Sequence, residues 1–282
     1  MQTADLLKRC AESLAVGPLG TEDLDLLEEW NSSVKCRSSL LTKRFLETPP
    51  PDWEGLITGH DAHRHAWYDL LSDELTIDEV AAFLLENKHY PAFLLLLEKI
   101  AEVQTCDEAV AAIAENIADE HRPEPHSQLM RRLMGAVQAR ARHDLALAEY
   151  PSLIDRMLVL YYGYYCNPWH LVGSVFATER MGTRRVACMD AGLRRLGLSE
   201  HELAFTTIHS QCDDHHASDW LKRVIVPSIV ADSNLRLCIA EGIASCLSTS
   251  NDYLTSLLIR VAVERASAGR QPVKRQSLGN SK

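Results

Sequence analysis

Two histidines and one aspartate are spaced so that they share one face of a predicted helix. His209, Asp213 and His216 stand at positions i, i+4 and i+7, which stack on one side of an α-helix. Two imidazoles and a carboxylate form an N/O ligand set that suits a redox-active or Lewis-acid metal. We therefore predict that this helix contributes three ligands to a metal centre.

A glutamate in an apolar segment upstream of this motif is the next candidate ligand. Glu179 lies at the end of an otherwise apolar segment, 171–180, which carries Gly173, Ser174 and Ala177. These small residues let helices approach closely, and a carboxylate in such surroundings is costly unless it is paired or bound to a metal. The segment therefore makes Glu179 a candidate metal ligand, with pairing to an arginine as the alternative.

A third segment completes the candidate site. Glu120 lies near the end of a predicted helix over 108–121, and His126 begins the next helix after two prolines, with His121 as a rival ligand. The three segments together supply three carboxylates and three histidines. Six mixed O/N ligands suit a pair of non-haem irons with open positions for dioxygen, whereas zinc hydrolases usually need three protein ligands plus water.

Two other histidine segments are weaker metal candidates. His60 and Asp61, in the segment 59–65, resemble the His-Asp pair of HD-type phosphohydrolases, but further positions at matching distances are absent. That segment is interpreted as a solvated loop and helix start. Glu86 and His89 form one Glu-x-x-His motif, whereas ferritin-like di-iron bundles need two such motifs on different helices.

Helical periodicity dominates the elements that must position these residues. Period-2 alternation is almost absent, as are a Rossmann fingerprint, a P-loop and a Gly-x-Ser-x-Gly elbow. The sequence therefore predicts an all-α architecture, a compact bundle of about seven core helices. The helices are expected over 77–103, 108–121, 127–148, 153–165, 171–180, 186–196, 199–226 and 233–246, the last with a continuation to 266.

The chain divides into a main domain with an extension at each end. Residues 1–55 are predicted to be an N-terminal helical extension, with two helices split at 17–20 and stopped by three prolines at 49–51. Residues 56–266 form the main domain. Residues 267–282 are nearly free of apolar side chains and are predicted to be a disordered tail.

Composition limits the function classes. The 282 residues include 46% hydrophobic residues, enough for one large core, and the net charge of −10 argues against nucleic acid as a partner. No run of 18 apolar residues exists to span a membrane, and the N-terminus has no signal-peptide pattern. Eight cysteines without a Cys-x-x-Cys pair predict reduced thiols, and hence a cytoplasmic protein.

The ligand pattern resembles that of the haem-oxygenase-like di-iron oxidase superfamily. Residues 116–120, Asn-Ile-Ala-Asp-Glu, match a family helix that ends in Asn-(Leu/Ile)-x-x-Glu, and a nearby His, a later lone Glu and His-x-x-x-Asp-x-x-His follow in the family's order over roughly residues 65–265. The resemblance implies a haem-oxygenase-like domain over 56–266 and a labile pair of ferrous ions. The implied ligands are Glu120, His126, Glu179, His209, Asp213 and His216. Many members carry a further glutamate, for which Glu86 and Glu98 are candidates.

The resemblance also implies an activity. Members reduce dioxygen at two ferrous ions for N-oxygenation, desaturation or oxidative C–C and C–N cleavage. It implies for this chain an oxidase or oxygenase of a small amino-acid-like metabolite in a biosynthetic pathway, and it leaves room for an external electron donor and a homodimer. The candidate partners for a substrate carboxylate are Arg180, Arg184, Arg185 and Arg194.

Two alternatives remain at the level of sequence. One is a metal-independent enzyme of the same fold, either a thiaminase II-like hydrolase or a pyrroloquinoline-quinone-synthase-like oxidase. The hydrolase would need a cysteine nucleophile, for which Cys166 and Cys212 are available. The other is a non-catalytic helical binding protein, in which Glu179 would be paired with an arginine and His209 and His216 would be dispersed on the surface.

Overall fold

Helices account for nearly all of the chain that the structure, a computed structural model, describes: residues 2–86, 91–141 and 151–268. No strand occurs in these ranges, so the predicted all-α class is confirmed. None of their helices is long and apolar enough to cross a lipid bilayer. The helices are α1 (Gln2–Val16), α2 (Thr21–Glu47), the 3₁₀-helix η1 (Pro50–Asp52), α3 (Trp53–Thr58), α4 (Asp61–Arg64), α5 (Trp67–Asp73), α6 (Ile77–Glu86), α7 (Phe93–Ala101), α8 (Asp107–Asp119), α9 (His126–Arg140), α10 (Pro151–Tyr165), α11 (Pro168–Arg195), α12 (Ala204–Asp219), the π-helix η3 (Trp220–Ile225), α13 (Val226–Ala231) and α14 (Leu235–Ala268).

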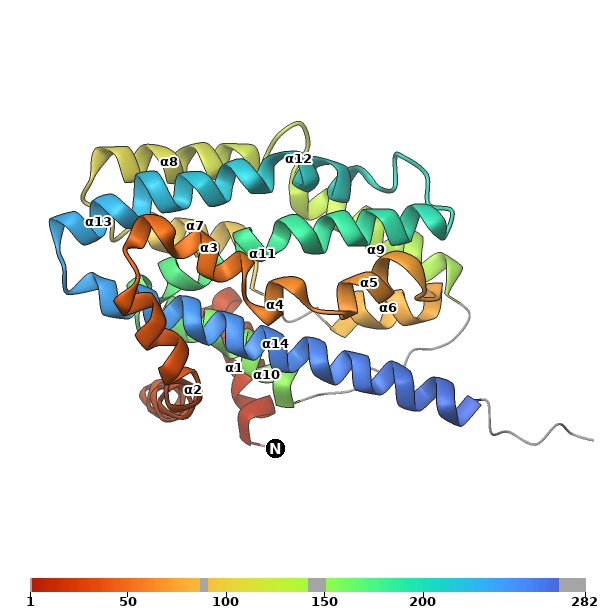
Figure 1. Ribbon diagram of the computed structural model, residues 1–282, viewed down its shortest axis with the longest axis horizontal. Coiled ribbons are helices and arrows are strands. Elements are labelled where there is room, and N and C mark those ends of the chain that lie inside the picture. Colours follow the sequence, from red (N-terminus) through yellow and green to blue (C-terminus); the bar gives the residue numbers. More distant parts are fainter. Residues whose placement is uncertain (1, 87–90, 142–150, 269–282) are drawn as a thin grey trace, which may run out of the picture.

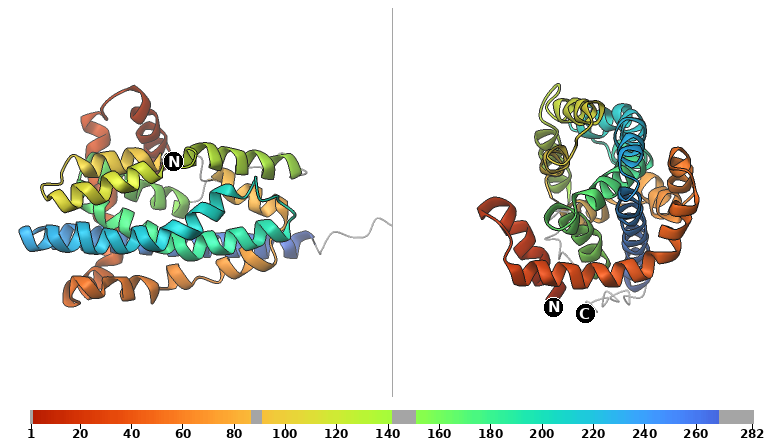
Figure 2. Two further views of the ribbon diagram at one scale, coloured as in Figure 1. Left: turned by 90° about the horizontal axis from the view of Figure 1, so that it is seen from above. Right: turned by 90° about the vertical axis from the view of Figure 1, so that its left-hand side faces the viewer.

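The long helix α11 lies in the middle of the bundle. It packs against α5, α10, α12 and α14, and Figures 1 and 2 show it among these helices. Every side chain from residue 170 to residue 179 is buried. Because a helix that is buried on all sides belongs inside a bundle, α11 is the element against which the site-bearing helices are placed.

Two glycines allow α11 and α14 to touch backbone to backbone. A Cβ atom on Gly173 would lie 2.0 Å from the carbonyl oxygen of Ile239, and one on Gly242 would lie 2.0 Å from that of His170. The Ser174 hydroxyl donates a hydrogen bond to the Gly242 carbonyl at 3.2 Å. Only glycine, which has no Cβ, permits so close an approach of two backbones.

The N-terminal helices pack on the outside of the bundle. Gly17, with φ of 144°, separates α1 from α2. Helix α2 packs against α10 and α14 and runs along one side of the bundle in the end-on view of Figure 2. The indole Nε1 of Trp30 donates to Asp155 Oδ1 at 2.8 Å and so links α2 to α10.

Several predicted helix bounds were wrong. The expected helix over 77–103 is two helices, α6 and α7, with Pro91 before the start of α7, because proline lacks an amide donor and disfavours helix in the preceding residue. The expected helices over 171–180 and 186–196 are one, α11. No proline lies between them, and Gly182 alone costs a helix only about 1 kcal/mol.

The C-terminal part of the chain also departs from expectation. The helix expected over 199–226 begins at Ala204 and widens into the π-helix η3 just before Pro227, whose missing amide and bulky ring disturb the preceding turn. Helix α9 ends at Arg140 rather than at 148, and residues 142–150 lie outside the described ranges. Of the predicted tail, Ser267 and Ala268 belong to α14, and 269–282 lie outside the described ranges too.

Candidate metal centre

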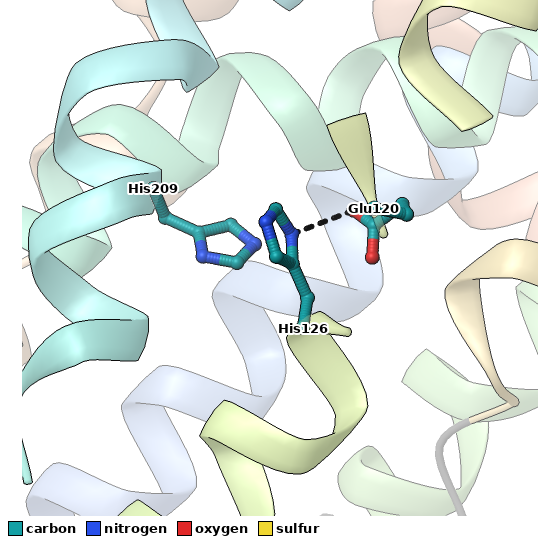
Figure 3. Close-up of side chains that lie close together, drawn as sticks. All are labelled: Glu120, His126 and His209. Carbon is teal, nitrogen blue, oxygen red and sulfur yellow. Dashed lines mark ion pairs between the residues drawn. The ribbon is translucent and has the colours of Figure 1, made fainter. Parts of the chain in front are cut away.

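Three predicted ligands from three helices meet at one point. Glu120 follows the last residue of α8, His126 is the first residue of α9, and His209 lies on α12. Each offers one ligand atom, and these atoms lie within 4.8 Å of one another. Figure 3 shows the His126 ring between His209 and Glu120. We call Glu120, His126 and His209 the triad.

The turn between α8 and α9 brings the first two triad residues together. The His126 amide donates to the Glu120 carbonyl at 2.9 Å, which closes the proline-containing segment back on itself. The two side chains then face each other, with 3.3 Å between His126 Nδ1 and Glu120 Oε1. His126 is 3% exposed, whereas the rival ligand His121 is exposed. The structure therefore places His126, and not His121, beside Glu120.

Backbone carbonyls fix which ring nitrogens of the triad are free to bind a metal. His126 Nε2 lies 3.2 Å from the Arg122 carbonyl oxygen, and His209 Nδ1 lies 2.8 Å from that of Phe205. A carbonyl only accepts, so the neutral rings keep their lone pairs on His126 Nδ1 and His209 Nε2. His126 Nδ1 is also buried without a well-aligned hydrogen bond. Histidines held in this way are typical metal ligands, so the triad fits a bound metal ion.

The protein environment shifts the pKa values of His126 and His209 in opposite directions. Burial alone lowers the pKa of His126, but the negative charge of Glu120, whose Oε1 lies 3.3 Å from His126 Nδ1, outweighs it and raises that pKa above its usual value. Burial above all, aided by the positive charges of His126 and Arg185, lowers the pKa of His209 to about 4. His209 is therefore neutral at pH 7, which is the form that a metal-binding histidine needs. A metal cation would displace the proton that Glu120 stabilises on His126.

Two of the remaining predicted ligands, Glu179 and His216, lie outside the triad. His216 is 6% exposed, and its Nε2 lies 3.2 Å from Asp119 Oδ2. Glu179 is 7% exposed on α11. The Asp213 side chain is outside the part of the chain that the structure describes. Asp119 was missed by sequence reasoning, although its position beside Glu120 at the end of α8 was the available signal.

The two candidates for a seventh ligand lie outside the triad. Glu98 is exposed. The Glu86 carboxylate is fully buried, forms an ion pair with Arg260, and accepts a hydrogen bond from the Tyr253 hydroxyl at 3.5 Å. Neither glutamate belongs to the triad, and His89, the partner of Glu86 in its motif, lies outside the described residues.

The histidine cluster at 59–65 supports helix starts. His60 Nδ1 accepts a hydrogen bond from the Ala62 amide at 3.1 Å, at the beginning of α4. His65 Nδ1 accepts one from the Trp67 amide at 3.1 Å, at the beginning of α5. These contacts agree with the interpretation of this segment as a loop and helix start.

The structure bears on one part of each alternative to a metal enzyme. Burial raises the pKa of Cys166 to about 12, so this thiol is not activated as a nucleophile. His209 is half-buried and His216 is buried, whereas the binding-protein alternative predicts both on the surface.

Comparison with protein families gives a match. A protein-family model described as "iron-containing redox enzyme" matches residues 80–250, which is more than half of the chain and includes all six predicted ligands. No curated protein matches the sequence.

Proposed function

Because the chain belongs to the iron-containing redox enzyme family, whose all-α haem-oxygenase-like fold it shares, we propose that it is a non-haem di-iron oxidase or oxygenase. The observation that carries this proposal is the triad, with one carboxylate and two imidazoles within 4.8 Å of one another. Two histidines and one carboxylate with open positions are the typical ligand set of dioxygen-activating ferrous sites.

The triad would hold the first iron. His126 Nδ1 and His209 Nε2 carry the free lone pairs, and the Glu120 carboxylate balances positive charge. A ferrous ion bound there supplies electrons and a binding position for dioxygen. The carbonyls of Arg122 and Phe205 keep the two rings in their ligand orientation, since they accept from the opposite ring nitrogens.

Glu179, Asp213 and His216 would hold the second iron. In support, His216 shares with His209 the α12 face that their spacing of seven residues creates. Glu179 is buried on α11, which packs against α12. Asp119 orients the His216 ring through its Nε2, as carboxylates commonly do for metal-binding histidines.

The proposed substrate is a small amino-acid-like metabolite, and the reaction is N-oxygenation, desaturation or oxidative C–C or C–N cleavage in a biosynthetic pathway. An external electron donor would complete the reduction of dioxygen where the substrate supplies too few electrons. In the metal-free protein, His126 Nδ1 lies 3.3 Å from Glu120 Oε1, so a proton held between them would leave when a metal ion binds.

Iron content after anaerobic ferrous loading tests the proposal. We expect two irons per wild-type chain and a marked loss in Glu120→Ala and His209→Ala variants. His201→Ala is the matched control, because His201 is exposed and is not a predicted ligand. Stopped-flow oxygenation of the loaded protein with amino acids and fatty acids should then give a visible transient with one substrate class. A wild-type chain that takes up no iron would refute the proposal.

A further inference from the structure

A cavity of about 550 Å³ lies between α8 and the segment formed by α12 and η3, two elements that run side by side in Figure 1. Its volume lies within the usual range of small-molecule sites. One wall is apolar and includes Ala111, Ala118, Trp220 and Val224.

The polar end of this cavity adjoins the triad along the chain. Asp119 and Arg122 line the cavity on either side of Glu120 in sequence, and the Arg122 carbonyl contacts His126 Nε2. His216 also lines it. A ligand at this end would therefore contact residues that neighbour Glu120 in sequence, together with His216.

One buried polar group in the cavity wall has no protein partner. Asn116 is 5% exposed, and no group in the described part of the chain donates a hydrogen bond to its Oδ1. A buried amide without hydrogen bonds costs free energy, and buried polar groups are nearly always satisfied. Because Asn116 lines the cavity, a ligand there can satisfy it.

The charges around the cavity leave one cation available. Glu115 and Asp219 are both paired with Arg223, and Asp119 contacts His216. The Arg122 side chain forms no ion pair or hydrogen bond with the residues that the structure describes. A guanidinium is suited to bind a carboxylate through two parallel hydrogen bonds.

We propose that this cavity binds a small zwitterionic amino acid. Its carboxylate pairs with Arg122, its amino group contacts Asn116 and Asp119, and its side chain lies on the apolar wall by Trp220. Binding of an amino acid in this cavity does not depend on the proposed function. Only the role of the cavity as the substrate site rests on that function.

The arginines that were predicted as carboxylate partners fit this role less well. Three are paired with carboxylates: Arg180 with Glu54, Arg184 with Asp69, and Arg194 with Asp190 and Glu200. Arg185 has no ion pair or hydrogen bond with the described residues, but it does not line this cavity. Arg185 is therefore the rival against which Arg122 is tested.

Anaerobic titration calorimetry of the full-length protein tests the site. The probes are the twenty protein amino acids, followed by the decarboxylated and deaminated analogues of the tightest binder. In Arg122→Gln we expect Kd to rise about 10- to 100-fold, as expected for the loss of a charged hydrogen-bonded pair. Ala118→Leu, which fills the cavity without changing charge, should also weaken binding. Arg131→Gln, which removes an exposed arginine outside the cavity lining, should leave Kd unchanged.

Three results would overturn the cavity site: no probe binds, Arg122→Gln binds as tightly as the wild type, or only Arg185→Gln weakens binding. Iron loading is measured in parallel, so the two proposals fail separately. A chain that binds an amino acid through Arg122 but takes up no iron keeps the cavity site and loses the di-iron function. A chain that takes up iron normally but binds amino acids independently of Arg122 keeps the di-iron function and loses the cavity site.

Discussion

Replacing Gly173 by alanine would place a methyl group against the backbone of α14. The new Cβ would lie 2.0 Å from the Ile239 carbonyl oxygen, whereas real Cβ atoms keep at least 3.0 Å from such atoms. The two helices would therefore have to separate by about 1 Å, the difference between these distances. A gap of that size forfeits about a quarter to a half of each affected dispersion contact.

We expect this separation to cost about 3 kcal/mol, at the upper end of the usual range for overpacking. One kcal/mol shifts Tm by about 2–4 °C in chains of roughly this size, so Tm should fall by about 6–12 °C. Gly135 on α9 is the matched control, since nothing lies within 4 Å of a Cβ built there. Gly135→Ala should instead stabilise by about 0.5–1 kcal/mol through better helix propensity.

Urea unfolding followed by circular dichroism measures both free energies, and a thermal scan gives both Tm values. The propensity gain is common to the two variants, so their difference isolates the helix contact. A Gly173→Ala protein as stable as the wild type would refute the close crossing of α11 and α14. Equal shifts in both variants would show that glycine flexibility, and not the contact, sets the effect.

Three further predictions concern buried charge and metal. Burial lowers the pKa of His170 to about 3, so only the unfolded chain binds this proton between pH 6.5 and 3. The free energy of unfolding therefore keeps its full value above pH 6.5 and falls by about 1.4 kcal/mol per pH unit below it. Between pH 7 and pH 5, urea unfolding should show a loss that is about 2 kcal/mol smaller in His170→Leu than in the wild type. Arg260→Met leaves the buried Glu86 carboxylate without its ion-pair partner and should lower the free energy of unfolding by about 3–5 kcal/mol. Most of this loss should be recovered in the double variant Glu86→Leu/Arg260→Met, as measured by urea unfolding. Ferrous ion at 100 times its Kd should stabilise the wild type by about 2.7 kcal/mol and His126→Ala much less, as read from anaerobic thermal scans.

Local patterns were enough to predict much of this molecule. Apolar spacing gave the all-α class, and the separation of His209 and His216 by seven residues put them on one helix face, because helical periodicity is a local property. Proline positions also indicate where helices are interrupted. Pro91 and Pro227 both mark places where the expected helices proved wrong.

Tertiary structure decided which of these local faces meet. The proline-containing turn closes so that the His126 amide bonds to the Glu120 carbonyl, and only then do the two side chains join His209 from α12. The pairing of His216 with Asp119 spans 97 positions of sequence, and no local spacing encodes it. Sequence spacing determined the ligand types and the helix faces, since both are properties of neighbouring residues. The assembled triad and the cavity beside it depend on how distant helices pack.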